Sequence, residues 1–532
     1  MAPRALLPFV FLVAGCFPPG EGVDAPLDAV YFPVGLALDA DASHLFVVSS
    51  DFDLQYNAGS VQSWDLVTLR DAVAKRGYGK ECGNEGARNP QDKLLYPGYC
   101  NALDHRAVPL MTGESGARPS LITGKVEIGA FATDVVYRPS PAGYGAGRLF
   151  VPVRGDATVH WIDTDAYGGL WCGNDTSGDE TARACDASHR SGDNDPAVEN
   201  GRFMSMLGEP FGIDASEDGR VLLVSNQTSA AVGLLENDWT GTQPPEQTVR
   251  YWFTNTGLRE RPMGVAALPE PKLAAARGLS PDNGYYPGFL VGFRSDPVIQ
   301  LVRAYLDSAA DPPRPYTEIT NQSPIYANSS GADSRGLVVD GARRRGEEQK
   351  CMQRFGIDEA CSKDVSCVAA SSNYEGYLAC LTTASAIPLD VFVPSRAPAS
   401  LLLGQSRAVN DNLATSDSPV FVGSVPLDLG PTRVSMGDVV NPAGELERRA
   451  FVVCFDSRRV VVYDPARKRI ETEIVTGRGP QAMVVDTAGG LGYVAHFTDS
   501  YIGVVDLDQR RPSTYGTIVA TVANPTPPRA SK

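Results

Sequence analysis

Charged side chains recur at one kind of place along the chain, in polar loops that directly follow short apolar runs. Arginine and aspartate dominate these loops, with one histidine and one asparagine among them. The residues are Asp51, Arg154, Asp156, Asn226, Arg294, Asp296, Arg396, Asp456, Arg458, His496 and Asp499. Guanidinium and carboxylate groups carried together on a rigid scaffold favour a site for a small molecule or a peptide. The alternative is that these are solvated loop residues that pair with one another.

His496 is the strongest single candidate for acid–base catalysis, because imidazole titrates near neutral pH and Asp499 follows closely. A nucleophilic triad would also need a positioned serine, and the chain contains no Gly-x-Ser-x-Gly motif. The five histidines are scattered, so a multi-histidine metal centre would have to assemble from distant loops. The sequence thus identifies no catalytic set, and we expect no cofactor other than a metal ion.

Oxygen donors gather in one acidic stretch, where Asp175, Asp179 and Glu180 are followed by Asp193 and Asp195. Such hard ligands, in a loop held by a disulfide, could bind Ca²⁺. The spacing lacks the glycine and the terminal glutamate of an EF-hand loop, and a solvated acidic loop is the simpler interpretation. Calcium is therefore the metal for which the sequence offers ligands.

Ten cysteines are arranged in locally even groups. Apart from Cys16 and Cys454 they lie in polar stretches: Cys82 and Cys100, Cys172 and Cys185, then Cys351, Cys361, Cys367 and Cys380. We expect the first two groups to form one disulfide each and the last group to form two, with three connectivities open. Cys454 stands inside an apolar run and is expected to be a buried free thiol.

The first sixteen residues resemble a bacterial lipoprotein signal. Arg4 precedes a short apolar run that is too short to span a bilayer, and the run ends in Val13-Ala14-Gly15-Cys16. The resemblance implies that the Cys16 thiol is lipidated, and Phe17 in place of aspartate favours the outer membrane. The alternative is an ordinary cleaved signal. The expected location is the cell envelope, with membrane contact through the lipid alone.

The net charge of −16 argues against a nucleic-acid partner, which would need clustered lysine and arginine. The 53 glycines and 40 prolines suit a turn-rich chain of strands and fit helices badly. At 532 residues the chain is too long for one ordinary core. It must contain either several domains or one repeat architecture.

The elements that would position the charged loops are supplied by a recurring phrase. It reads Pro-x-Gly, an apolar run, a turn, a second apolar run, a polar loop and a third run that often ends in aspartate. Pro210-Phe211-Gly212 opens one complete copy, and Pro431 and Pro480 open two copies that lie about 50 residues apart. Seven copies occur, starting near residues 33, 133, 210, 262, 335, 431 and 480. A sheet of this size cannot bury both faces alone, so the copies must stack.

The prediction is an all-β fold, a seven-bladed β-propeller over residues 27–523. Residues 1–15 would be the signal segment, 16–26 a tether and 524–532 a disordered tail. Insertions stapled by disulfides are expected near 66–128, 165–205 and 342–388. The run at 517–522 would be the outer strand of the last blade, and residues 29–32 could latch the ring. Two β-sandwich domains are the alternative fold.

The repeat resembles the YVTN-type, lactonase-like β-propeller repeat. Gly492-Tyr493-Val494-Ala495 and Val504-Val505-Asp506 carry the resemblance, and the copies starting near residues 262 and 335 depart from it. The resemblance implies a fold more than a function. We expect a non-catalytic scaffold that binds an envelope protein, peptide or glycan. The alternatives are a structural surface protein and a propeller enzyme, either a lactonase-like hydrolase or a dehydrogenase-like one, with its site at the axis.

Overall fold

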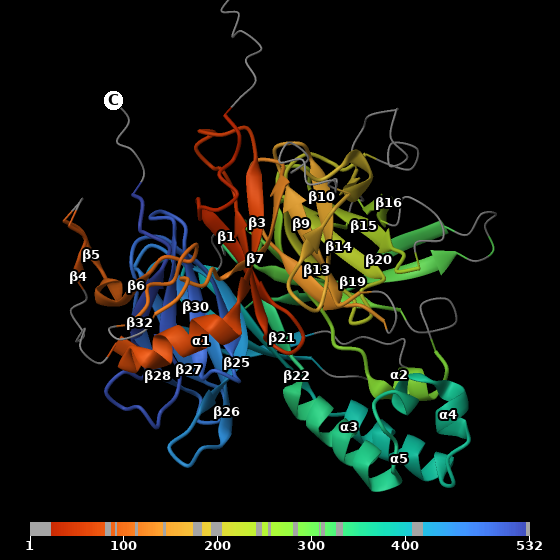
Figure 1. Cartoon of the computed structure of the whole chain (residues 1–532). Coiled ribbons are helices and arrows are strands. Elements are labelled where there is room, and N and C mark those ends of the chain that lie inside the picture. The colour runs from red at the N-terminus through yellow and green to blue at the C-terminus, as the bar shows by residue number, and fades with distance from the viewer. Residues whose placement is uncertain are drawn as a thin grey trace, which may run out of the picture.

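The computed structural model describes residues 23–79, 87–90, 93–111, 115–141, 145–173, 184–192, 205–240, 247–253, 257–279, 286–307, 309, 314–325, 333–406 and 419–527. Seven antiparallel sheets follow one another along the chain, and the protein is a seven-bladed β-propeller, as predicted (Figure 1). The first strand of each sheet contacts a neighbouring sheet, and contacts between β29 and β1 close the ring.

Blades 1 to 3 use the strands nearest the N-terminus. Blade 1 consists of β1 (Pro33–Leu38), β2 (His44–Ser49), β3 (Gly59–Asp65) and β7 (Ile122–Ile128). Blade 2 consists of β8 (Val136–Pro139), β9 (Gly147–Val153), β10 (Thr158–Thr164), β11 (Leu170–Trp171) and β12 (Arg190–Ser191). Blade 3 consists of β13 (Pro210–Ala215), β14 (Val221–Asn226), β15 (Ala231–Asn237) and β16 (Gln247–Phe253).

Blades 4 to 7 complete the ring. Blade 4 consists of β17 (Pro262–Ala267), β18 (Gly288–Phe293), β19 (Val298–Asp307) and β20 (Arg314–Pro324). Blade 5 consists of β21 (Val338–Asp340), β22 (Leu389–Arg396), β23 (Ala399–Ser406) and β24 (Pro419–Pro426). Blade 6 consists of β25 (Pro431–Val440), β26 (Leu446–Cys454), β27 (Arg459–Asp464) and β28 (Arg469–Val475). Blade 7 consists of β29 (Pro480–Asp486), β30 (Leu491–His496), β31 (Tyr501–Asp506) and β32 (Ile518–Val522).

The apolar runs fill the spaces between neighbouring blades. One cluster joins Phe46 and Val48 of blade 1 to Leu149 and Val151 of blade 2, and all four are buried. Small residues are required where inner strands approach each other. A Cβ atom added to Gly212 would lie 2.1 Å from the Met263 carbonyl oxygen of the next blade. This close approach explains the third position of the Pro-x-Gly phrase.

The ring closes with help from the first insertion, which reaches across to blade 7. It contains α1 (Leu66–Lys75), the pair β4 (Ala87–Arg88) and β5 (Leu95–Tyr96), and β6 (Ala102–Leu103). β6 pairs in parallel with β32, and Arg70 of α1 forms two hydrogen bonds to Asp486 of blade 7, at 2.6 and 2.7 Å. The run 29–32 adds no strand, although the Phe32 N–H donates to the Ser500 hydroxyl at 3.1 Å. The strand that helps to close the ring is therefore β6, because it pairs with the outer edge of β32.

A helical insertion projects from blade 5 (Figure 1). It comprises α3 (Ala342–Phe355), α4 (Val365–Ala369) and α5 (Tyr374–Ser385), which pack against α2 (Lys272–Ala276) of blade 4 around a small apolar core. Disulfides join Cys351 to Cys380 and Cys361 to Cys367. No helix of the described ranges is long and apolar enough to cross a membrane.

The remaining cysteines follow the predicted arrangement where they are described. Cys172 is bonded to Cys185, and Cys454 is a buried free thiol. Burial raises the pKa of the Cys454 thiol to about 12. Cys100 is disulfide-bonded, whereas Cys82 and Cys16 lie outside the described residues. Ala25, in the expected tether, and Leu27, just after it, are buried together with Ala58.

Candidate axial ligand site

Two rings of residues meet where the propeller axis opens. The first ring is the residue after the opening position of each inner-strand phrase: Val34, Thr133, Phe211, Met263, Arg335, Thr432 and Gln481. The second ring is the residue that follows the second strand, or in blade 5 ends it: Ser50, Arg154, Gln227, Arg294, Arg396, Phe455 and Phe497. In all seven blades the N–H of the second-ring residue donates to the carbonyl of the residue two before the first-ring residue, at 2.8–3.1 Å. This repeated bond gives the seven loops a common backbone position.

A cavity of about 250 Å³ lies between the two rings. Its lining combines guanidinium groups with phenyl rings. The lining residues are Val34, Ser50, Phe52, Phe131, Ala132, Thr133, Arg154, Phe211, Arg335, Arg396, Thr432, Arg433, Phe455, Gln481 and Phe497. No other described cavity draws residues from six of the seven blades.

An ion pair that crosses the axis closes the floor of the cavity. The third position of the phrase is Gly or Ala in five blades, but it is Asp134 in blade 2 and Arg433 in blade 6. Arg433 Nη1 donates to Asp134 Oδ1 at 2.5 Å, and its Nη2 donates to the Thr133 carbonyl at 2.8 Å. Both side chains are about one-fifth exposed. The pair therefore replaces the open channel that small residues alone would leave.

Each of the other cavity arginines is also held by a carboxylate. Arg335 donates to Asp333 through Nε and Nη2 at 3.0–3.2 Å. Arg154 pairs with Glu209 at 2.9 Å, and Arg396 pairs with Asp456. None of these carboxylates lines the cavity. The carboxylates orient the guanidinium groups from behind and leave their remaining N–H groups toward the open space.

The phenyl rings form a cluster on one side of the mouth. The centroid of Phe52 lies 5.2 Å from that of Phe497 and 5.9 Å from that of Phe131. The ring of Phe32 packs against the ring of Phe497, with the two centroids 5.0 Å apart. Phe52 is half exposed, so the cluster has an accessible face. Tilted and edge-to-face rings of this kind make a stable apolar wall.

His496 and Asp499 do not reach the cavity. His496 is fully buried, stacks on Tyr501 at 4.0 Å, and accepts a hydrogen bond at Nε2 from the Gly477 N–H at 3.1 Å. Burial lowers the pKa of His496 to about 3. Asp499 is also fully buried and accepts two hydrogen bonds from Arg478. These two residues stabilise the inside of blade 7, because their positions in the loop face away from the axis.

Asp156 and Asn226 also have structural partners. Asp156 accepts hydrogen bonds from the Thr158 hydroxyl at 2.6 Å and pairs with His160 at 3.2 Å. Burial alone would raise the pKa of Asp156. The hydrogen bond to His160 and the positive charge of the imidazole outweigh burial, so the pKa of Asp156 lies below its ordinary value. Asn226 is fully buried and donates to the Leu207 carbonyl at 2.8 Å. Neither side chain lines the axial cavity.

The other predicted loop residues divide between the rim and the cavity. Arg294 lies 4.0 Å from Asp333, and Asp296 lies 3.5 Å from Arg259, so both form rim ion pairs. Arg458 has a left-handed backbone with φ near 57° and does not line the cavity. Of the predicted set, the structure brings together Arg154, Arg396 and the Asp456 partner of Arg396. The proposed calcium ligands Asp175, Asp179 and Glu180 lie outside the described residues.

Asp51 stands in the chain between two lining residues, Ser50 and Phe52. Its Oδ1 accepts the Tyr56 N–H at 3.2 Å, and its Oδ2 has no hydrogen-bond partner among the described residues. Burial raises the pKa of Asp51 to about 6. The side chain turns into its own loop and does not line the cavity. Among the described residues no group of three or more His, Cys, Asp or Glu side chains could hold a metal ion.

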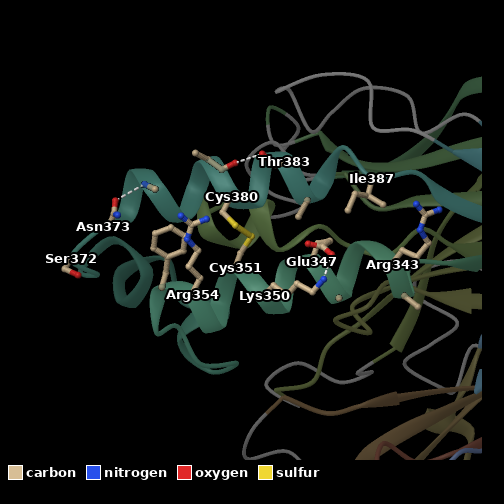
Figure 2. A pocket seen from close by; sticks show the side chains of 16 residues that line it. Arg343, Glu347, Lys350, Cys351, Arg354, Ser372, Asn373, Cys380, Thr383 and Ile387 are labelled. Carbon is tan, nitrogen blue, oxygen red and sulfur yellow. Dashed lines mark hydrogen bonds and ion pairs between the residues drawn. A yellow bond between two sulfur atoms is a disulfide. The ribbon is translucent and has the colours of Figure 1, made fainter. Parts of the chain in front are cut away.

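A larger hollow lies far from the axis, between α3 and α5. Figure 2 shows this groove, which has a volume of about 1200 Å³ and contains the Cys351–Cys380 disulfide. Its charged side chains are exposed: Lys350 and Glu347 form an ion pair but remain 70% and 47% accessible. Surface pairs of this kind are weak and common, so the groove does not compete with the axial cavity as a site.

The sequence analysis missed the first ring and the phenyl cluster. The positions of the first ring were visible, because each is the x of the Pro-x-Gly phrase, but their residue types vary. Phe52, Phe455 and Phe497 occupy positions next to the proposed residues Asp51, Asp456 and His496. Their recurrence in loops, where large apolar side chains are unusual, was the available signal.

No family model matches the chain, and no curated protein matches it. Several solved structures are similar to the chain at low identity. Kuenenia stuttgartiensis hydrazine synthase is 12% identical with a TM-score of 0.44, covering 92% of this chain and 99% of that one. A putative 6-phosphogluconolactonase from Bacteroides uniformis is 11% identical with a TM-score of 0.41, covering 84% and 86%. The Pseudomonas aeruginosa periplasmic gluconolactonase PpgL is 12% identical with a TM-score of 0.41, covering 86% and 88%.

Fold and site together define the class: a seven-bladed β-propeller with disulfide-bonded cysteines and a hollow on its axis. The activities of these neighbours do not transfer to this chain. The function must be argued from the cavity itself.

Proposed function

We propose that this protein is a lipid-anchored binding protein of the cell envelope, and that its ligand site is the axial cavity. The observation that supports this is the composition of the cavity wall. Four guanidinium groups and five phenyl rings line it, with no histidine, cysteine, lysine or carboxylate among the described lining residues. Such a wall can hold a ligand by charge-assisted hydrogen bonds and apolar contact. It offers no side chain that exchanges a proton near pH 7.

The envelope location is supported by the Val13-Ala14-Gly15-Cys16 segment and by the disulfides, which belong to an oxidising compartment. In this proposal the Cys16 thiol carries the lipid, and the protein sits at the outer membrane.

The binding proposal is tested by recovering the ligand. The full chain is incubated with envelope extract, with and without calcium, then repurified and denatured, and the released compounds are identified by mass spectrometry. A compound bound at the cavity should be lost with Arg396→Gln and retained with Arg459→Gln, whose side chain pairs with Glu473 and Asp428 on the outer part of blade 6. If every recovered compound is equally retained by both variants, the cavity is not the site.

The anchor is tested separately by metabolic labelling with a lipid precursor. The wild-type chain should carry the label, and Cys16→Ser should abolish it. A label that persists in the variant would refute lipidation at Cys16.

One observation favours a second candidate, a lactonase-like hydrolase. Several guanidinium donors that converge on a cavity can stabilise an oxyanion. Hydrolysis of gluconolactone by the full chain, faster than in buffer and slowed by Arg396→Gln but not by Arg459→Gln, would favour this alternative. If gluconolactone is hydrolysed no faster with the protein than in buffer alone, the hydrolase alternative is rejected and the binding function is retained.

A further inference from the structure

The axial cavity has two chemically different walls. Arg335 and Arg396 both belong to blade 5, whereas Phe52, Phe131 and Phe497 come from blades 1, 2 and 7. In a closed ring of seven blades, blade 5 stands opposite the boundary between blades 1 and 2. A guanidinium wall therefore faces a phenyl wall across the axis, and the Asp134–Arg433 pair forms the floor between them.

The guanidinium wall retains unused hydrogen-bond donors. A guanidinium group carries five N–H donors. Arg335 uses its Nε and Nη2 on Asp333, and Arg396 uses its Nη2 on Asp456, so Nη1 of each arginine has no acceptor among the described residues. Beside Phe131 in blade 2, Arg154 Nε is buried and has no described acceptor, although Arg154 Nη2 pairs with Glu209. A buried donor without an acceptor is destabilising, and an acceptor on a ligand would satisfy it.

The local charge is close to balanced. Four arginines line the cavity, and four carboxylates, Asp134, Glu209, Asp333 and Asp456, pair with them from outside its lining. Arg294 at the rim also pairs with Asp333, at 4.0 Å, so the surplus is one positive charge, which is too little to compensate a dianion such as a phosphate monoester. Directional donors without a large positive field suit a planar group with one negative charge, and a carboxylate matches the fork of N–H groups.

The phenyl wall and the volume define the rest of the ligand. A face formed by Phe52, Phe131 and Phe497 favours a flat or aliphatic body that can stack or slide against the rings. A space of about 250 Å³ lies just below the range of about 300–1000 Å³ that is typical of pockets for drug-sized ligands. The closed floor excludes a chain that would thread the axis.

We infer that the axial cavity binds a small monocarboxylate with an apolar body, its carboxylate held by Arg335 and Arg396 and its body against Phe52, Phe131 and Phe497. This inference rests on the proposed function, because it specifies the ligand class of the same site. It excludes phosphorylated sugars as preferred ligands, since the cavity lacks the positive charge to compensate a phosphate dianion.

The inference is tested by isothermal titration of the full chain carrying Cys16→Ser, with phenylbutyrate as the probe. Phenylbutyramide has the same shape without the charge, and phenylpropyl phosphate carries a dianion. Phenylbutyrate should bind at least tenfold more tightly than the amide and more tightly than the phosphate. Arg396→Gln should weaken phenylbutyrate binding about tenfold, the size expected for one charge-assisted pair. Phe52→Ala should weaken both the acid and the amide by a similar factor.

Arg459→Gln is the matched control and should leave all three affinities unchanged, because its partners lie on the outer part of blade 6. Equal affinity for acid and amide, a preference for the phosphate, or equal effects of Arg396→Gln and Arg459→Gln would overturn the inference. So would the lack of saturable phenylbutyrate binding up to about 10 mM. The proposed function fails on a different result, namely that no compound recovered from envelope extract depends on the cavity.

Discussion

The two ends of the inner strands use the same pair of residue types in opposite ways. At the end where the strands stop, Asp486 is fully buried and its partner Arg70 lies outside it, one-quarter exposed. At the cavity end, Asp456 is 45% exposed and its partner Arg396 is 22% exposed. The first arrangement covers the carboxylate, and the second turns the guanidinium group toward a hollow.

This difference separates structural ion pairs from available ones. Asp486 accepts hydrogen bonds from Arg70, from the Tyr493 hydroxyl and from the Gly489 N–H, so both of its oxygens are satisfied. Two similar pairs, Arg138–Asp214 and Arg448–Asp340, join neighbouring blades at the same end. The cavity pairs leave donors unused. An Arg–Asp pair on a propeller therefore indicates a site only when the guanidinium faces an open space.

The largest effect is expected at the structural end. Asp486→Ala removes the shared acceptor of three donors and should lower the free energy of unfolding by about 3 kcal/mol. Denaturant unfolding of the wild-type and variant chains measures this change. A loss below about 1 kcal/mol would show that the ring does not depend on the latch between blades 7 and 1.

The pH dependence of His496 tests whether the cavity end of the strands contains buried neutral groups rather than ions. Its folded-state pKa of about 3 is below its ordinary value, so the unfolded chain binds a proton first as the pH falls. The stability that His496 contributes is complete above about pH 6.5 and should be lost as the pH drops from there toward 3. NMR titration should show its imidazole resonances, assigned by their absence in His496→Gln, unchanged between about pH 8 and 4. Titration near pH 6.5 would restore His496 as a candidate acid–base group.

Asp51 should show the opposite pH dependence. Burial raises its folded-state pKa to about 6, so the unfolded chain ionises first as the pH rises. The wild-type chain should therefore lose stability relative to Asp51→Asn between about pH 4 and 6, and the difference should stay constant above that range. Thermal unfolding of both proteins across this range measures the effect. If the thermal stability of the wild-type chain instead rises relative to that of Asp51→Asn as the pH increases, the carboxylate is ionised and paired.

The smallest effect is expected at Asp456→Ala. Its carboxylate is nearly half exposed, so its loss should change the free energy of unfolding by less than about 1 kcal/mol. Comparison with Asp486→Ala in the same denaturant series gives the contrast directly. Equal losses at the two positions would remove the distinction between the two ends of the strands.

The sequence was sufficient to predict the blades. The Pro-x-Gly phrase specifies a tight inner strand, as the close approach of Gly212 to Met263 shows, and β-branched runs such as that ending at Cys454 specify the strands. The site was only partly predictable. Arg154, Phe455 and Phe497, one position after their second strands, line the cavity, whereas Asp499, three positions after its strand, is buried in its own blade. That distinction depends on loop geometry, which residue type does not reveal.

The latch made by the first insertion imposes an order on assembly. Arg70 and Asp486 are separated by 416 positions, and β6 meets β32, one of the last elements of the chain. Contacts over such separations form late, because the entropy of closing the loop must be overcome before they stabilise anything. A chain emerging N-terminus first must therefore hold blade 1 with its open edge until blade 7 arrives. Truncation before β32 should leave an open, aggregation-prone arc rather than a slightly smaller ring.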